Sequence, residues 1–314
     1  MGIVVENGGV LTTVQDEGRF GYQAYGVSTS GAMDSHAFHI ANLLVGNKMT
    51  EGALEMTFIG PALHFTQDNI IAVTGGDLAP MLDGRPFPMW KAVLVKEGQK
   101  LSFGGMRNGC RGYIAFAGGL DVPLVMGSKS TLLRNNLGGI DGRKLQQGDE
   151  IGFTSPKTEL PNMEKRRVPA EVYPDKEIVL RVVLGPQDDE FTEAGIRSFF
   201  WHSGVITNEF DRMGCRIERD PIEHKGDGNI NTDGISLGSI QVPANGKPII
   251  MLADRQSTGG YAKIGTVISV DLPKIAQSQP GFKVRFIQVG LELAQSLYIR
   301  ELNKMKELDK TLNG

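Results

Sequence analysis

Residues 91–103 read KAVLVKEGQKLSF and indicate how the chain folds. Two short runs of strand-forming residues, AVLV and KLSF, flank a polar connection that contains Gly98. This pattern is typical of a β-hairpin, in which a tight connection keeps neighbouring strands antiparallel. We therefore predict an antiparallel hairpin over 91–103.

Similar short runs recur along the 314 residues. They are rich in valine and isoleucine, and Gly, Pro, Asn and Asp separate them; glycine alone contributes 41 residues. Clear examples are NIIAVTG at 69–75, GYIAFAGG at 112–119, EIVLRVVLG at 177–185 and KVRFIQVG at 283–290. Many short strands joined by glycine-rich turns favour an all-β fold of barrels or sandwiches.

Helices are expected in few places. Four segments carry apolar residues at helical spacing: 34–45, 188–200, a short segment from Asp271, and 291–312. Asp34 and Asp188 are the expected N-caps of the first two, because a short polar side chain can accept a hydrogen bond from a free N–H. The last turn of the final helix, KTLNG, is expected to fray.

A linker is predicted near the middle of the chain. Residues 154–176 contain four prolines and show no hydrophobic period, which is typical of an exposed connection between domains. We predict an N-terminal β domain over 1–155, a linker over 156–176, and a C-terminal β domain with a terminal helix over 177–314.

Composition argues against several classes of protein. The 33 basic and 36 acidic residues give a net charge of −3, so nucleic acid is not an expected partner. No run of 18 apolar residues occurs, so no membrane span is expected. The two cysteines, Cys110 and Cys215, are too few for a disulfide framework, and a reducing cytoplasm is predicted. His36 and His39 lack a visible third ligand, so no metal site is predicted on the chain.

Four segments are too polar and too rich in glycine for a core: 11–34, 127–149, 208–218 and 252–277. Arginine forks suit carboxylate or phosphate, amides of glycine turns can bind anions, and carboxylates can move protons or position a cation. Together these predict a site for a small anionic substrate with a nucleotide. The alternative is structural, since such charge pairs often brace turns and contribute only ~0–1 kcal/mol when exposed.

The same segments carry a resemblance to a known family. In order along the chain they contain TVQDEGRFGYQAYGVSTSGAMD, STLLRNNLGGIDGRKLQQGD, NEFDRMGCRIE and DRQSTGGYAKIGTVISVDLPKIAQSQPG. These resemble the biotin-dependent carboxyltransferase family, also called the KipA or allophanate-hydrolase-subunit-2 family, over roughly residues 3–290. The resemblance implies two cyclophilin-like β-barrel domains.

The resemblance also implies an activity and partners. It is greatest to stand-alone bacterial members, which implies a subunit of an ATP-dependent 5-oxoprolinase. That enzyme opens 5-oxoproline to L-glutamate, coupled to ATP hydrolysis, and needs two partner proteins, one of the KipI type and one of the LamB/YcsF type. ATP and Mg²⁺ are the expected cofactors of the complex.

Two other functions stay open within the family. One is a carboxyltransferase that takes its carboxyl group from biotin on another protein. An external carrier is needed because Met305-Lys306 lies in the predicted terminal helix and not in the β-hairpin where a carrier accepts biotin. The other is a KipA-type regulatory protein that antagonises an inhibitor of a histidine kinase.

The matching motifs select the candidate site residues, whose roles are hypotheses. Asp16, Arg19, Asp34 and Asp254 are the catalytic candidates, the aspartates as bases or cation ligands and Arg19 for an anionic group. The candidates for binding substrate or phosphate are Ser30, Arg134, Arg212, Arg255, Gln256, Thr258, Gly259, Gly260 and Tyr261. Gly259 and Gly260 are expected to cradle phosphate through their amides.

Overall fold

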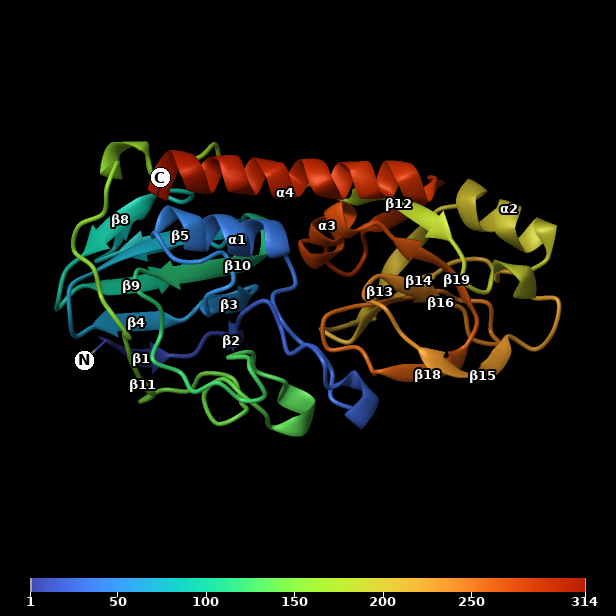
Figure 1. The fold of residues 1–314 in the computed structure, drawn as a ribbon, viewed down its shortest axis with the longest axis horizontal. Helices are drawn as coiled ribbons and strands as arrows, with labels where there is room; N and C mark the ends of the chain where they lie inside the picture. Colours follow the sequence, from blue (N-terminus) through green and yellow to red (C-terminus); the bar gives the residue numbers. More distant parts are fainter. Residues whose placement is uncertain (1, 314) are drawn as a thin grey trace. The chain divides into compact units, whose positions relative to one another are not determined.

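A computed structural model describes residues 2–313. The chain divides into two compact units, coloured by sequence in Figure 1. The first comprises Met1–Arg19, Ser30–Tyr173 and Asn303–Gly314, and the second comprises Phe20–Thr29 and Pro174–Leu302. The predicted linker at 156–176 falls across the junction after Tyr173.

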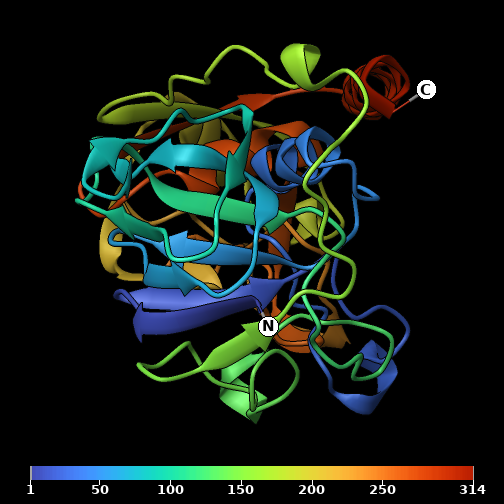
Figure 2. The same ribbon diagram turned by 90° about the vertical axis from the view of Figure 1, so that its left-hand side faces the viewer.

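Two β-sheets form the first unit (Figures 1 and 2). The six-stranded sheet has the order β11 (Glu150–Gly152), β1 (Gly2–Asn7), β4 (Ala62–Phe65), β9 (Lys100–Phe103), β6 (Pro80–Leu82), β7 (Arg85–Pro86). The five-stranded sheet has the order β2 (Leu11–Gln15), β3 (Ala53–Thr57), β10 (Asn108–Phe116), β5 (Asn69–Asp77), β8 (Ala92–Val95). All pairings described in both sheets are antiparallel.

Strand β5 is buried on both faces, and its side chains divide between two apolar clusters. Ile71 and Val73 join the cluster shared by the two sheets. Ile70 and Ala72 point to the opposite face, because side chains alternate along a strand, and pack with helix α1 (Ser35–Leu44). Strand β5 therefore shows a continuous apolar run from Ile70 to Val73 without polar alternation.

Helix α1 forms where it is predicted. The side chain of Asp34 accepts a hydrogen bond from Ala37 N at 3.0 Å, which satisfies a free N–H of the first turn. Gly46, in the left-handed conformation, follows the helix. In Figure 1, α1 lies along β5 and β10 of the five-stranded sheet.

The predicted hairpin over 91–103 is wrong. Strand β8 pairs with β5, where Val95 is opposite Asn69. Strand β9 instead pairs with β4 and β6 in the other sheet. Asp68 holds the connection in place, since it accepts from Lys96 Nζ at 2.8 Å and Glu97 N at 2.7 Å. The connection thus crosses from one sheet to the other.

A closed barrel forms the second unit. Its strand order is β12 (Glu177–Leu184), β19 (Lys263–Val267), β16 (Ser239–Gln241), β17 (Ile249–Met251), β14 (Gly214–Glu218), β13 (Gly204–Phe210), β20 (Lys283–Gln288). Strand β20 closes the barrel by pairing parallel to β12. A separate two-stranded ribbon joins β15 (Asn229–Gly234) to β18 (Thr258–Tyr261). The predicted all-β fold class is confirmed.

Helices α2 (Glu193–Trp201) and α3 (Leu272–Ala276) accompany the barrel. Thr192 and not Asp188 caps α2, because its side chain accepts from Gly195 N at 2.9 Å. Residues 188–190 form a 3₁₀ turn. The ring of Phe199 on α2 stacks on Phe286 of β20, with centroids 4.5 Å apart.

Helix α4 (Leu291–Asn313) extends further than predicted. Its last turn does not fray, because the buried guanidinium of Arg166 donates to Leu312 O at 2.8 Å and Asn313 Oδ1 at 2.6 Å. Met305 and Leu312 also join the cluster around α1. No helix within residues 2–313 has the length and apolar character needed to cross a bilayer.

Candidate functional site

Asp16, in the first unit, binds a loop of its own chain, residues 125–131. Its Oδ1 accepts from the hydroxyls of Ser128 at 2.7 Å and Ser130 at 2.5 Å, and from Gly18 N at 2.9 Å. Its Oδ2 accepts from Lys129 N at 2.6 Å. The carboxylate is buried, and these donors use its acceptor positions. Asp16 therefore orders the 125–131 loop.

Arg19 and Ser30 hold the same loop. The fully buried guanidinium of Arg19 donates to Val125 O at 2.9 Å and Ser130 O at 2.8 Å. The Ser30 hydroxyl donates to Thr131 O at 2.9 Å. Asp16, Arg19 and Ser30, which were predicted to contact a ligand, thus lie together. Their hydrogen bonds named above are made to the backbone and side chains of the 125–131 loop.

Asp34 and Arg134 lie elsewhere in the first unit. Asp34 caps α1, and its Oδ2 also accepts from the hydroxyl of Tyr173 at 3.2 Å. Burial, followed by the nearby charge of Asp34, raises the pKa of Tyr173 well above its ordinary value of 10.0, so this hydroxyl stays a donor. Arg134 is exposed on a 3₁₀ turn, Leu133–Asn135.

In the second unit, Arg212 and Asp254 form a buried ion pair. Arg212 Nε lies 3.0 Å from Asp254 Oδ2, and Nη2 lies 3.0 Å from Oδ1. Both side chains are almost fully buried, with 5% and 6% exposed. This two-point geometry fixes the start of the 254–261 segment and uses both carboxylate oxygens.

Arg255, the next residue, is also buried. Its Nε donates to Ile235 O at 3.0 Å, and its Nη1 donates to Thr29 Oγ1 at 3.2 Å and Leu252 O at 3.3 Å. Burial lowers the pKa of this guanidinium to about 10, which still leaves it protonated at neutral pH. Ser28 donates to Arg255 O at 2.6 Å, so residues 20–29 attach to the second unit, which the sequence does not reveal.

The predicted phosphate cradle is a strand. Thr258, Gly259, Gly260 and Tyr261 form β18, which pairs with β15. Extended amides alternate in direction, so they do not converge on one anion as in a nest. Gln256, which precedes the strand, is half-buried, and Tyr261 is 40% exposed.

A second group of buried polar side chains lies beneath this ribbon. Lys263 and Gln241 are opposite each other on β19 and β16, and only 2% and 1% of them are exposed. Lys263 Nζ donates to Asp233 Oδ2 at 3.0 Å, and Gln187 Nε2 donates to the same oxygen at 3.3 Å. Gln241 Nε2 is buried and has no hydrogen-bond partner among residues 2–313.

Sequence reasoning does not identify Gln187, Asp233 or Gln241. Lys263 lies in a segment singled out for its polarity but is not among the candidate residues. One signal does mark it: a lysine stands between Ala262 and Ile264, in a run otherwise suited to a buried strand. A buried lysine generally needs a partner, and that requirement points to this cluster.

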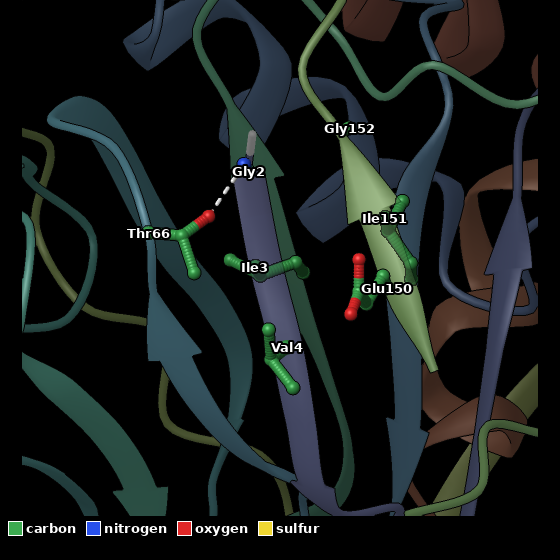
Figure 3. A pocket seen from close by; sticks show the side chains of 7 residues that line it. All are labelled: Gly2, Ile3, Val4, Thr66, Glu150, Ile151 and Gly152. Atoms are coloured by element: carbon green, nitrogen blue, oxygen red, sulfur yellow. Dashed lines mark hydrogen bonds between the residues drawn. The ribbon is translucent and has the colours of Figure 1, made fainter. Parts of the chain in front are cut away.

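An open groove of about 400 Å³ lies beside strands β1 and β11 (Figure 3). It is lined by Gly2, Ile3, Val4, Thr66, Glu150, Ile151 and Gly152. Thr66 Oγ1 accepts from Gly2 N at 2.8 Å. Its one ionisable group is Glu150, so the groove has no basic side chain for an anionic substrate, and none of the candidate residues lines it.

Comparison with known proteins identifies the family. Residues 25–288 match the family model described as carboxyltransferase domain, subdomain A and B. The chain therefore belongs to the carboxyltransferase-domain family, and the resemblance noted in the sequence is confirmed.

Similar proteins fall into two groups. The chain is 36% identical to the C subunit of 5-oxoprolinase from Escherichia coli strain K12, over 91% of each chain. It is 34% identical to urea amidolyase of Saccharomyces cerevisiae, over 96% of this chain but 17% of that protein. The crystal structure of Kluyveromyces lactis urea carboxylase matches with a TM-score of 0.90 and 30% identity, covering 98% of this chain and 29% of that one.

Proposed function

We propose that this protein is a subunit of an ATP-dependent 5-oxoprolinase, which opens 5-oxoproline to L-glutamate together with a KipI-type protein and a LamB/YcsF-type protein. One observation carries the proposal. The similarity to the C subunit of E. coli 5-oxoprolinase extends over 91% of both chains, so the two proteins correspond along nearly their whole length. The predicted compartment is the cytoplasm.

The chemistry of the substrate sets what the complex has to provide. 5-Oxoproline carries one carboxylate and a lactam, whose resonance makes the carbonyl carbon a poor electrophile. Coupling to ATP hydrolysis supplies the driving force for opening such a ring. This chain contributes buried cationic and amide donors in its second unit, which suit recognition of the carboxylate.

The residues predicted for ATP and Mg²⁺ do not fit those groups within this chain. Gly259 and Gly260 are extended in a paired strand, and the carboxylates of Asp16 and Asp254 bind donors of their own unit. Among residues 2–313 no three His, Cys, Asp or Glu side chains are grouped to hold a metal ion. The proposal therefore assigns no step of nucleotide chemistry to these residues.

Reconstitution tests the proposal. The chain is mixed with candidate KipI-type and LamB/YcsF-type proteins, 5-oxoproline and ATP-Mg, and L-glutamate is measured over time. We expect glutamate to form only when all three proteins and ATP are present. The matched control omits this chain and keeps the others. Absence of glutamate from the complete mixture, with each protein folded, contradicts the proposal.

A second candidate function rests on the structural match to urea carboxylase, which covers 98% of this chain. In that case the chain would transfer a carboxyl group from an external biotin carrier to an amide. The same reconstitution with a carboxylated biotin carrier in place of ATP separates the two functions, because the readout becomes loss of the carboxyl group from biotin.

A further inference from the structure

We propose that Lys263 and Gln241 form a binding site for a small carboxylate, beneath the ribbon of β15 and β18. The site is inferred from the geometry of this chain, and only the choice of 5-oxoproline as first probe rests on the proposed function. Two independent observations carry it: a buried amide with no partner and a buried ammonium group with unused donors.

The amide of Gln241 is the first observation. Its side chain is almost fully buried, with 1% exposed, and Nε2 has no hydrogen-bond partner within residues 2–313. A buried donor without a partner costs about 1–3 kcal/mol, so native proteins rarely retain one without a reason. An acceptor supplied by a ligand removes that cost.

Lys263 is the second observation. An ammonium group has three N–H donors, and Asp233 is the one partner of Lys263 Nζ in the described part of the chain. The lysine side chain is 2% exposed, whereas that of Asp233 is 52% exposed. The remaining donors have no acceptor among the described residues, so a ligand oxygen could accept from them.

The two donors face the same place. Lys263 and Gln241 are register partners on β19 and β16, which places their Cβ atoms about 5 Å apart on one face. Asp233 and Gly259 are themselves partners on the ribbon. Lys263 donates a hydrogen bond to Asp233. A Cβ atom built on Gly259 would lie 2.6 Å from Gln241 Nε2. The donors of Lys263 and Gln241 therefore both face the ribbon at the residue pair Asp233 and Gly259.

Gly259 has a role here that differs from a phosphate cradle. A side chain at this position would collide with Gln241 Nε2 and, at 2.8 Å, with Ile235 Cδ1. The carbonyl of Ile235 receives the buried Arg255 guanidinium, so a second positive charge lies along the same wall. Glycine at position 259 therefore keeps a side chain away from the Gln241 amide on the underside of the ribbon.

The donor set selects the class of ligand. A carboxylate has two coplanar oxygens and one negative charge, which match one ammonium group and one neutral amide. Asp233 shows the arrangement, because its own carboxylate already accepts from Lys263 and from Gln187. A free carboxylate would take the place of Asp233, whose side chain is 52% exposed on a largely exposed strand.

Binding to the intact isolated chain tests the site. Calorimetric titration with sodium 5-oxoproline is compared with 2-pyrrolidinone, the same ring without the carboxylate, and with sodium chloride. We expect saturable binding of 5-oxoproline alone among these three. Bicarbonate is a further probe of the same chemistry: if it binds with the same dependence on Lys263, the site holds and its ligand belongs to carboxyl transfer.

Variants locate the binding. Lys263→Met and Gln241→Met should each weaken it by about tenfold or more, as expected for a charge-assisted or buried hydrogen bond. The matched control is Lys247→Met, which removes an exposed lysine paired with Glu218 in the same unit and should leave the affinity unchanged. Asp233→Asn should tighten binding by about threefold or more, because the competing carboxylate is lost.

Tightening by Asp233→Asn distinguishes a ligand site from a structural ion pair, since loss of a merely structural pair cannot improve affinity. The inference is overturned if no carboxylate binds saturably, if Lys263→Met binds as well as the natural chain, or if Asp233→Asn binds more weakly. Glutamate formation in the reconstituted complex without carboxylate binding to this chain would overturn the inference and leave the proposed function intact. Carboxylate binding to this chain without glutamate formation in the reconstituted complex would overturn the proposed function and leave the inference intact.

Discussion

Buried donors around Asp16 in the first unit share an acceptor of their own chain, whereas donors of Lys263 and Gln241 in the second unit stay unused. Around Asp16, the hydroxyls of Ser128 and Ser130 and the amide of Lys129 all converge on one carboxylate. Around Lys263, two donors of the ammonium group and the amide of Gln241 have no acceptor among the described residues.

This difference separates two uses of polar residues. A carboxylate that accepts four hydrogen bonds from its own chain fixes a loop and has little capacity for a ligand. The unpartnered amide of Gln241 stabilises nothing by itself, and its position opposite Lys263 favours a ligand-binding role. Four variants, ordered by the size of their expected effect on stability, test this difference.

The largest effect is expected for Asp16→Ala. Loss of the carboxylate leaves several buried donors of the 125–131 loop without an acceptor, so unfolding free energy should fall by about 3–5 kcal/mol. Urea unfolding followed by circular dichroism measures it. The control is Asp141→Asn, which removes a charge from a side chain that is 79% exposed and keeps a residue type that tolerates the left-handed backbone there. Unchanged stability combined with loss of turnover in the complex would instead assign Asp16 to the substrate.

Asp254→Asn should have the next largest effect. The amide cannot balance the buried charge of Arg212, and we expect a loss of about 2–4 kcal/mol in urea unfolding. Glu218→Gln is the matched control, because its partner Lys247 is exposed and such pairs contribute only ~0–1 kcal/mol. If the two variants lose the same amount, the pair of Arg212 and Asp254 does not brace the second unit.

For Gln241→Met the expected change in stability has the opposite sign. Replacing an unpartnered amide by an apolar side chain of similar size removes a desolvation cost, so stability should be unchanged or increase by about 1 kcal/mol. Carboxylate affinity should fall at the same time. Thermal unfolding and calorimetric titration of one preparation measure both. A loss of stability would mean that the amide supports the fold, which contradicts the contrast drawn here.

The smallest effect concerns pH. The hydrogen bond from Lys263 holds the pKa of Asp233 below its ordinary value of 3.8. Because the folded-state pKa is the lower one, the pair stabilises the fold above pH 3.8 and loses this contribution as the pH falls through the folded value. Acid unfolding of Asp233→Asn should therefore be slightly less steep than that of the natural chain. Identical acid unfolding curves would show that Asp233 and Lys263 are not coupled.

Local signals in the sequence predict local structure well. Asp34 followed by apolar residues at helical spacing is sufficient to place α1, because an N-cap acts within one turn. The 91–103 stretch fails for the complementary reason. Its residues show two strands and a turn, but the partners of those strands are β4, β5 and β6, which lie elsewhere in the chain.

The candidate residues show the same limit. Polarity and glycine content select Asp16, Arg19 and Ser30, which hold one loop, but they do not distinguish a loop brace from a ligand contact. Lys263 and Gln241 meet only because β16 and β19 pair across a bulge, and no pattern in either strand encodes that register. The pairing of strands that are distant in the sequence determines which buried donors lack an acceptor.

The order in which the chain is synthesised gives Arg166 a further consequence. The acceptors of its Nη2, Leu312 and Asn313, follow the whole of residues 174–302, which belong to the other unit. At ~5–20 residues per second, translation of that stretch takes on the order of 10 s. During this interval Nη2 of the guanidinium and an apolar surface beside α1 stay open to water and to chaperones. The first unit, whose synthesis starts before that of the second, is therefore completed only after the second has been synthesised.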